Sequence, residues 1–110
     1  MILYLDTSAL VKRYLQEDGS AETQAVIRRA RETGTAVVAR AEGCAAFAKA
    51  VRTGAITREA AENAMYGFQE DWQDVYVLSV SNALADQAGR LAWSHGLRGY
   101  DAVHLAAALA

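Results

Sequence analysis

A chain of 110 residues is long enough for one small domain, and a content of 53% hydrophobic residues supplies a core, which excludes a disordered chain. A net charge of -2 excludes a protein that holds nucleic acid by bulk electrostatics, so any nucleic-acid chemistry needs a local site. The single cysteine, Cys44, excludes an intramolecular disulfide and a cysteine-based zinc cage, and its alanine-rich surroundings favour a small core residue.

The first predicted element is a buried strand over the short apolar run from Ile2 to Leu5, which ends at Asp6. This apolar stretch is too short for a signal peptide or a membrane span, so we expect a cytoplasmic protein. The polar cluster Asp6-Thr7-Ser8 then predicts the start of a helix.

The next segments predict a helix, a strand and two further helices. Residues 21–34 form a helix closed by Gly34, and residues 35–38 form the second strand. A helix begins at Ala39, with Gly43 and Phe47 on one face, and ends at Gly54. Thr57 caps the helix that follows over residues 57–72.

The last third predicts one strand and two helices. Residues 75–80 are rich in β-branched and aromatic residues, which is typical of a strand. Ser81-Asn82 starts a helix that Gly96 stops, and Gly99 precedes a final helical segment. The order β-α-α-β-α-α-β-α-α predicts an α/β domain with a mostly parallel sheet covered by helices, in three layers.

Asp6 is the first candidate site residue, because ligands of open parallel sheets bind beyond the carboxyl ends of the strands. The alternative is that Asp6 only caps the following helix. Since Thr7 or Ser8 could cap that helix without a charge, we favour a functional Asp6.

Two further carboxylates are predicted near the same carboxyl ends of the strands. Glu42 lies in the first turn of the helix after the second strand, and Asp101 opens the last helix. Both positions are also favoured by the helix dipole alone. Asp101 and His104 are the only acidic or histidine side chains after Gly99 and share a helix face; we interpret His104 as a packed core residue.

Three converging carboxylates would repel one another without a cation between them. Oxygen ligands suit Mg²⁺ or Mn²⁺, which can activate a bound water. Lys12, Arg13 and Lys49 are possible phosphate contacts, although we interpret them as solvated surface charges.

Three motifs resemble those of the PIN-domain family. DTSALVKRY resembles the first motif, with Asp6 as metal ligand and Ser8 as supporting residue; AEGCAAFAKAVRTGAIT resembles the second, with Glu42; and LRGYDAVHLAAALA resembles the third, with Asp101. The resemblance covers the whole chain and implies a three-layer α/β/α fold. It also implies a Mg²⁺- or Mn²⁺-dependent endoribonuclease, similar to VapC toxins, which are neutralised by a cognate antitoxin and are often homodimers.

The chain departs from this family near its end, where the fourth carboxylate and the terminal strand have no counterpart. We therefore expect residues 1–110 to form a single PIN-like domain truncated at the C-terminus. The final residues HLAAALA support this expectation, because they offer no polar cap for the helix. The alternative function is a non-catalytic PIN-like module that binds an antitoxin or another subunit.

Overall fold

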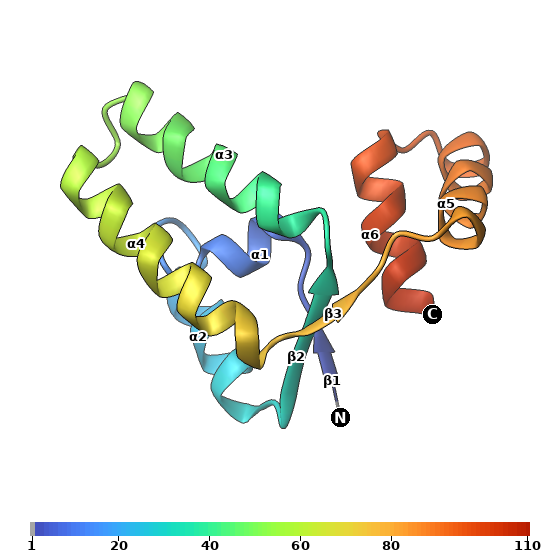
Figure 1. The fold of residues 1–110 in the computed structure, drawn as a ribbon, viewed down its shortest axis with the longest axis horizontal. Helices are drawn as coiled ribbons and strands as arrows, with labels where there is room; N and C mark the ends of the chain where they lie inside the picture. Colours follow the sequence, from blue (N-terminus) through green and yellow to red (C-terminus); the bar gives the residue numbers. More distant parts are fainter. Residues whose placement is uncertain (1) are drawn as a thin grey trace.

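A three-stranded parallel sheet lies at the centre of the molecule (Figure 1). The computed structural model describes residues 2–110. The strands are β1 (Ile2–Tyr4), β2 (Glu32–Ala36) and β3 (Tyr76–Leu78), in the spatial order β1-β2-β3. In the register, Leu3 pairs with Thr33, and Thr35 pairs with Val77.

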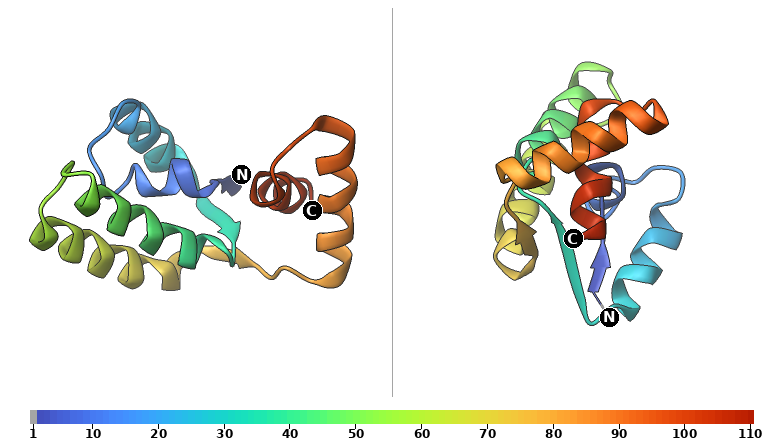
Figure 2. Two further views of the ribbon diagram at one scale, coloured as in Figure 1. Left: turned by 90° about the horizontal axis from the view of Figure 1, so that it is seen from above. Right: turned by 90° about the vertical axis from the view of Figure 1, so that its right-hand side faces the viewer.

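Helices cover the sheet on both sides, so the predicted three-layer α/β/α architecture is confirmed (Figures 1 and 2). The first group, α1 to α4, packs on one side, and α5 and α6 pack together on the other. The bounds of the helices are α1 (Thr7–Val11), α2 (Ser20–Arg29), α3 (Ala39–Arg52), α4 (Arg58–Asp71), α5 (Asn82–His95) and α6 (Gly99–Leu109), with one 3-10 turn, η1 (Trp72–Asp74). Within residues 2–110, no helix is both long and apolar enough to cross a membrane.

The predicted helix ends are confirmed for the second half of the chain. The Thr57 hydroxyl accepts a hydrogen bond from the Ala60 amide at the start of α4. The Ser81 hydroxyl does the same for Leu84 at the start of α5, and Gly96 ends α5 with a φ of 65°. These caps satisfy local backbone groups and need no distant partner, which is why the sequence predicts them well.

The predicted end of the second helix at Gly34 is wrong. The predicted second strand over residues 35–38 exists but lies earlier in the chain, at Glu32–Ala36. Gly34 lies in the middle of β2, which begins at Glu32. A Cβ atom at this position would stand 3.3 Å from both Ile2 Cγ2 and the Tyr76 backbone oxygen. The glycine therefore lets the neighbouring strands β1 and β3 approach closely, and it does not end a helix.

The main core lies between the sheet and helices α1 to α4. Its largest buried side chains are Leu10, Phe47 and Phe68. The Phe68 ring meets those of Tyr14, Phe47 and Trp72 edge to face, with centroids 5.6–5.7 Å apart. Such aromatic contacts add to the stabilisation that comes from burial.

A second, smaller cluster joins α5 to α6 and contains only small buried residues, Ala88, Ala102 and Ala106. Leucine side chains of α5 and Val103 pack around them. The two clusters are separate, so the α5–α6 pair needs further contacts to hold its place against the sheet.

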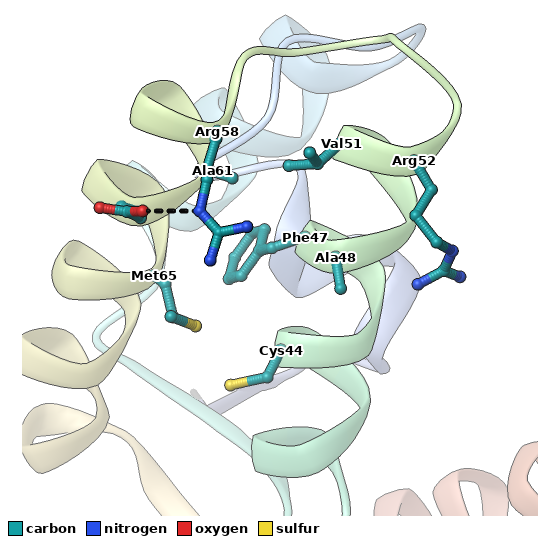
Figure 3. A pocket seen from close by; sticks show the side chains of 9 residues that line it. Cys44, Phe47, Ala48, Val51, Arg52, Arg58, Ala61 and Met65 are labelled. Atoms are coloured by element: carbon teal, nitrogen blue, oxygen red, sulfur yellow. Dashed lines mark hydrogen bonds and ion pairs between the residues drawn. The ribbon is translucent and has the colours of Figure 1, made fainter.

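Cys44 faces an apolar groove of about 270 Å³ between α3 and α4 (Figure 3). Phe47 and Val51 line it from α3, and Ala61 and Met65 from α4. Cys44 is half-buried against the main core, as predicted for a small core residue. No carboxylate of the predicted site lines this groove, so the predicted chemistry belongs elsewhere.

Gly43 provides a test of the α3–α4 packing. A Cβ atom there would stand 2.8 Å from the Phe68 ring, which is buried and held by its aromatic neighbours. We expect Gly43→Ala to lower the free energy of unfolding by about 1–3 kcal/mol, because the ring has no room to move. Urea denaturation followed by circular dichroism measures this loss.

Gly89 is the matched control, since it lies within α5 with nothing within 4 Å of an added Cβ atom. Gly89→Ala should stabilise the protein by roughly 0.5–1 kcal/mol through helix propensity alone. A Gly43→Ala protein that gained the same stability would contradict the close packing.

Candidate functional site

The carboxyl ends of β1 and β2 lie at the same edge of the sheet, because the strands are parallel and adjacent. Asp6 follows β1 directly and has extended backbone angles, with φ -73° and ψ 175°. Its Oδ1 accepts a hydrogen bond from the Ala9 amide at 2.9 Å. Asp6 is therefore the N-cap of α1 itself, and neither Thr7 nor Ser8 takes that position. The capping bond fixes the exposed Asp6 carboxylate at this edge of the sheet.

Glu42 reaches the same edge from the first turn of α3. The Thr7 hydroxyl donates a hydrogen bond to Glu42 Oε1, and His104 Nε2 lies 2.9 Å from that same oxygen. Thr7 and His104 are themselves 3.2 Å apart. Residues that are 35 and 62 positions from Glu42 in the chain thus hold one of its oxygens in place.

His104 lies at the centre of this network, only 7% exposed. Its Nδ1 is 2.7 Å from the Tyr4 hydroxyl. Because a carboxylate can only accept, Nε2 carries a hydrogen and donates it to Glu42. In the neutral ring Nδ1 then accepts the hydrogen of Tyr4. Burial raises the pKa of Tyr4 to about 12, and the charges of Asp6 and Glu42 add to the effect, so the phenol keeps its proton at neutral pH.

Asp101 lies in the first turn of α6 and is exposed. Its Oδ2 is 3.4 Å from Arg98 Nε, in a pair whose side chains are 58% and 92% exposed, and such a surface pair adds little stability. Asp101 and Asp6 line one open depression of about 550 Å³, whose wall includes Tyr4 and His104. Two of the three predicted carboxylates therefore share one depression, and the third lies behind His104.

The donor atoms of this region suit a hard divalent cation, because they are carboxylate oxygens with no thiolate among them. Within residues 2–110, however, no three side chains of His, Cys, Asp or Glu form a ready arrangement around one point. Glu42 Oε1 is engaged by Thr7 and His104. The residues fit such a cation by their chemistry, with Asp6 and Asp101 closest to forming its site.

Sequence reasoning missed three contacts of the site. The sequence predicts only a strand for Tyr4, the start of a helix for Thr7 and a core position for His104. His104 is indeed buried and hydrogen-bonded, but its partner is Glu42. The spacing of three residues between Asp101 and His104 on one helix face was the available signal. Ser8, the predicted supporting residue, faces a neighbouring depression between α1 and α3.

Comparisons with known proteins show which family the sequence resembles. The PIN domain family model matches residues 3–110. The chain is 34% identical over 109 residues to two proteins of Mycobacterium tuberculosis, Ribonuclease VapC45 and Ribonuclease VapC49, covering 99% of this chain and 76% of each relative. It is 31% identical over 108 residues to Ribonuclease VapC3 of Pyrobaculum aerophilum, covering 98% of this chain and 82% of that relative.

The Tyr4–His104 hydrogen bond provides a test of the network. Tyr4→Phe leaves the buried His104 Nδ1 without its donor, and we expect the free energy of unfolding to fall by about 1–3 kcal/mol. Tyr100→Phe is the control, because Tyr100 is 64% exposed and its hydroxyl makes no hydrogen bond within residues 2–110. Chemical denaturation compares the two variants. Equal stability of Tyr4→Phe and the parent would contradict the assigned bond.

Proposed function

The chain belongs to the PIN domain family, and from this we propose that it is a metal-dependent endoribonuclease that hydrolyses RNA phosphodiester bonds. The observation that carries the proposal is the depression shared by Asp6 and Asp101, with Glu42 held beside it. Three relatives that are named as ribonucleases support RNA as the substrate.

In this proposal Asp6, Glu42 and Asp101 hold one Mg²⁺ or Mn²⁺ ion. A bound ion of this kind lowers the pKa of a coordinated water and stabilises negative charge on a phosphate in the transition state. Asp6 contributes its second oxygen, since Oδ1 caps α1. Asp101 contributes from a side chain whose only ion pair within residues 2–110 is the weak one with Arg98.

Thr7, His104 and Tyr4 act as positioning residues. Thr7 and His104 both donate to Glu42 Oε1. These two bonds fix the orientation of the carboxylate, and Oε2 is the oxygen that the proposal assigns to the metal. Tyr4 holds the tautomer of His104 that donates to the carboxylate. Buried positioning groups of this kind keep a carboxylate in one orientation at little entropic cost during the reaction.

The biological role in the proposal is that of the toxin in a toxin–antitoxin pair, with a cognate antitoxin protein and a homodimer as partners. These partners come from the resemblance to VapC proteins, and the cytoplasm is the place where such a toxin meets RNA. The second candidate, a non-catalytic interaction module, draws on the observation that Glu42 is already engaged by protein donors. Cleavage by the purified chain distinguishes the two functions.

The first test is cation binding, measured by isothermal titration with Mn²⁺. The parent chain should bind one ion, and Asp6→Asn and Asp101→Asn should each weaken binding at least about tenfold, since each removes a charged ligand. Asp86→Asn is the control, because Asp86 is exposed on α5 and outside the depression. Equal affinity of all four proteins for Mn²⁺ would refute the assigned ligands.

The second test is RNA cleavage. Asp6→Asn keeps the helix cap, because Asn is as good an N-cap as Asp, so the fold should remain intact. We expect the rate of Mg²⁺-dependent cleavage to fall at least about 100-fold, because the metal supplies both the nucleophile and charge stabilisation. A gel assay with labelled RNA measures the rate. If the folded parent cleaves no RNA with Mg²⁺ or Mn²⁺, the non-catalytic function is the correct one.

A further inference from the structure

We propose that the depression between α1 and α3 binds phosphates of the RNA strand beside the acidic site, with Lys49 and Lys12 as the contacting cations. The inference rests on the proposed ribonuclease function and names the surface along which the substrate lies. It revises the interpretation of these lysines as ordinary surface charges.

The depression has a volume of about 420 Å³ and is open to solvent on the outside of α1 and α3. Small side chains of α3, Ala46 and Ala50, line it together with Thr53 just beyond that helix. Thr7 and Ser8 line it from the start of α1. Hydroxyl groups and lysines are the groups that proteins use to contact phosphate oxygens without reading a sequence.

The lysines of this chain are concentrated in one place. The sequence contains only two, Lys12 and Lys49, and both line this depression although they are 37 positions apart. Lys49 is exposed and makes no ion pair in the part of the chain that the structure describes. Lys12 pairs with Glu17 at 3.6 Å, with side chains 26% and 43% exposed. A pair this exposed is weak, so a phosphate can replace Glu17.

A structural role alone does not account for Lys49. A cation in the last turn of a helix is favoured by the helix dipole, and both Lys49 and Arg52 occupy the last turn of α3. Arg52, however, lines the apolar groove on the α4 side, whereas Lys49 lines the depression on the α1 side. The dipole explains why cations are present at this helix end but not why one of them faces the hydroxyl-lined surface.

The depression adjoins the acidic site through α1. Thr7 lines the depression and donates to Glu42, and Asp6 precedes it in the chain. An acidic centre in a protein of net charge -2 repels RNA, so cations next to it are needed to hold the strand. Arg13 does not line the depression, so it is not assigned this role.

The test is binding of a short fluorescent single-stranded RNA to the whole chain, measured by anisotropy in EDTA over a range of salt concentrations. Without divalent metal no cleavage occurs, so binding is measured independently of the proposed reaction. Removing one phosphate contact lowers the slope of log K against log salt by about 0.7, which corresponds to roughly fivefold weaker binding at 0.1 M salt. We expect this loss for Lys49→Gln.

Glu17→Gln should have the opposite effect, because it releases Lys12 and so tightens RNA binding and steepens the salt dependence. Arg90→Gln on α5 and Glu70→Gln on α4 are matched controls, since they change the net charge equally and neither residue forms an ion pair within residues 2–110. Circular dichroism confirms that all four variants are folded.

The outcomes separate the two proposals. Opposite effects of Lys49→Gln and Glu17→Gln with unchanged controls support the RNA surface, even if the chain proves unable to cleave RNA. A Lys49→Gln protein that binds like the parent, a parent that binds no RNA, or controls that shift as much as the two variants would overturn it. Loss of cleavage alone bears only on the ribonuclease function.

Discussion

The chain of contacts from Tyr4 through His104 to Glu42 links the two halves of this molecule, whose hydrophobic clusters are separate. One cluster lies under α1 to α4, and the other lies between α5 and α6. His104 projects from α6 to a strand residue and to the first turn of α3, over 100 and 62 positions of sequence. Because a buried imidazole without partners is costly, these hydrogen bonds fix where α6 sits on the sheet. The position of Asp101, three residues before His104 on the same helix, depends on that attachment.

Contacts from two distant segments hold Glu42 in place beside the acidic depression. Within residues 2–110, the basic side chains within ion-pair distance of Asp6, Glu42 and Asp101 are Arg98, which lies beside Asp101, and His104, which lies beside Glu42. The Thr7 hydroxyl donates a hydrogen bond to Glu42 Oε1, and His104 Nε2 lies 2.9 Å from the same oxygen. These contacts hold the Glu42 carboxylate in one orientation. Tyr4, whose pKa is raised to about 12 by burial, supplies the proton that completes the network.

The short helix α1 separates two surfaces of opposite charge. Its N-cap, Asp6, belongs to the acidic depression, whereas Ser8 and Lys12 face the depression toward α3. Thr7 takes part in both, through its bond to Glu42 and its place in the wall of the second depression. The helix therefore has one of the proposed metal ligands, Asp6, as its N-cap and one of the lysines proposed to contact the RNA strand, Lys12, as its C-cap. This proximity is possible because α1 begins directly at the end of β1.

The sequence by itself determined the order of strands and helices, the caps at Thr57, Ser81 and Gly96, and the three-layer class. These features depend on local hydrogen bonds and on periodicity, which neighbouring residues decide. It also named Asp6, Glu42 and Asp101 as candidates, because each follows a strand or opens a helix. Only the tertiary structure decided that β2 contains Gly34, since the close approach of Ile2 and Tyr76 there is a contact between strands. It likewise decided that His104 bonds Glu42 and that Lys12 and Lys49 line one surface. Such pairings depend on how distant segments pack, and no local pattern carries that information.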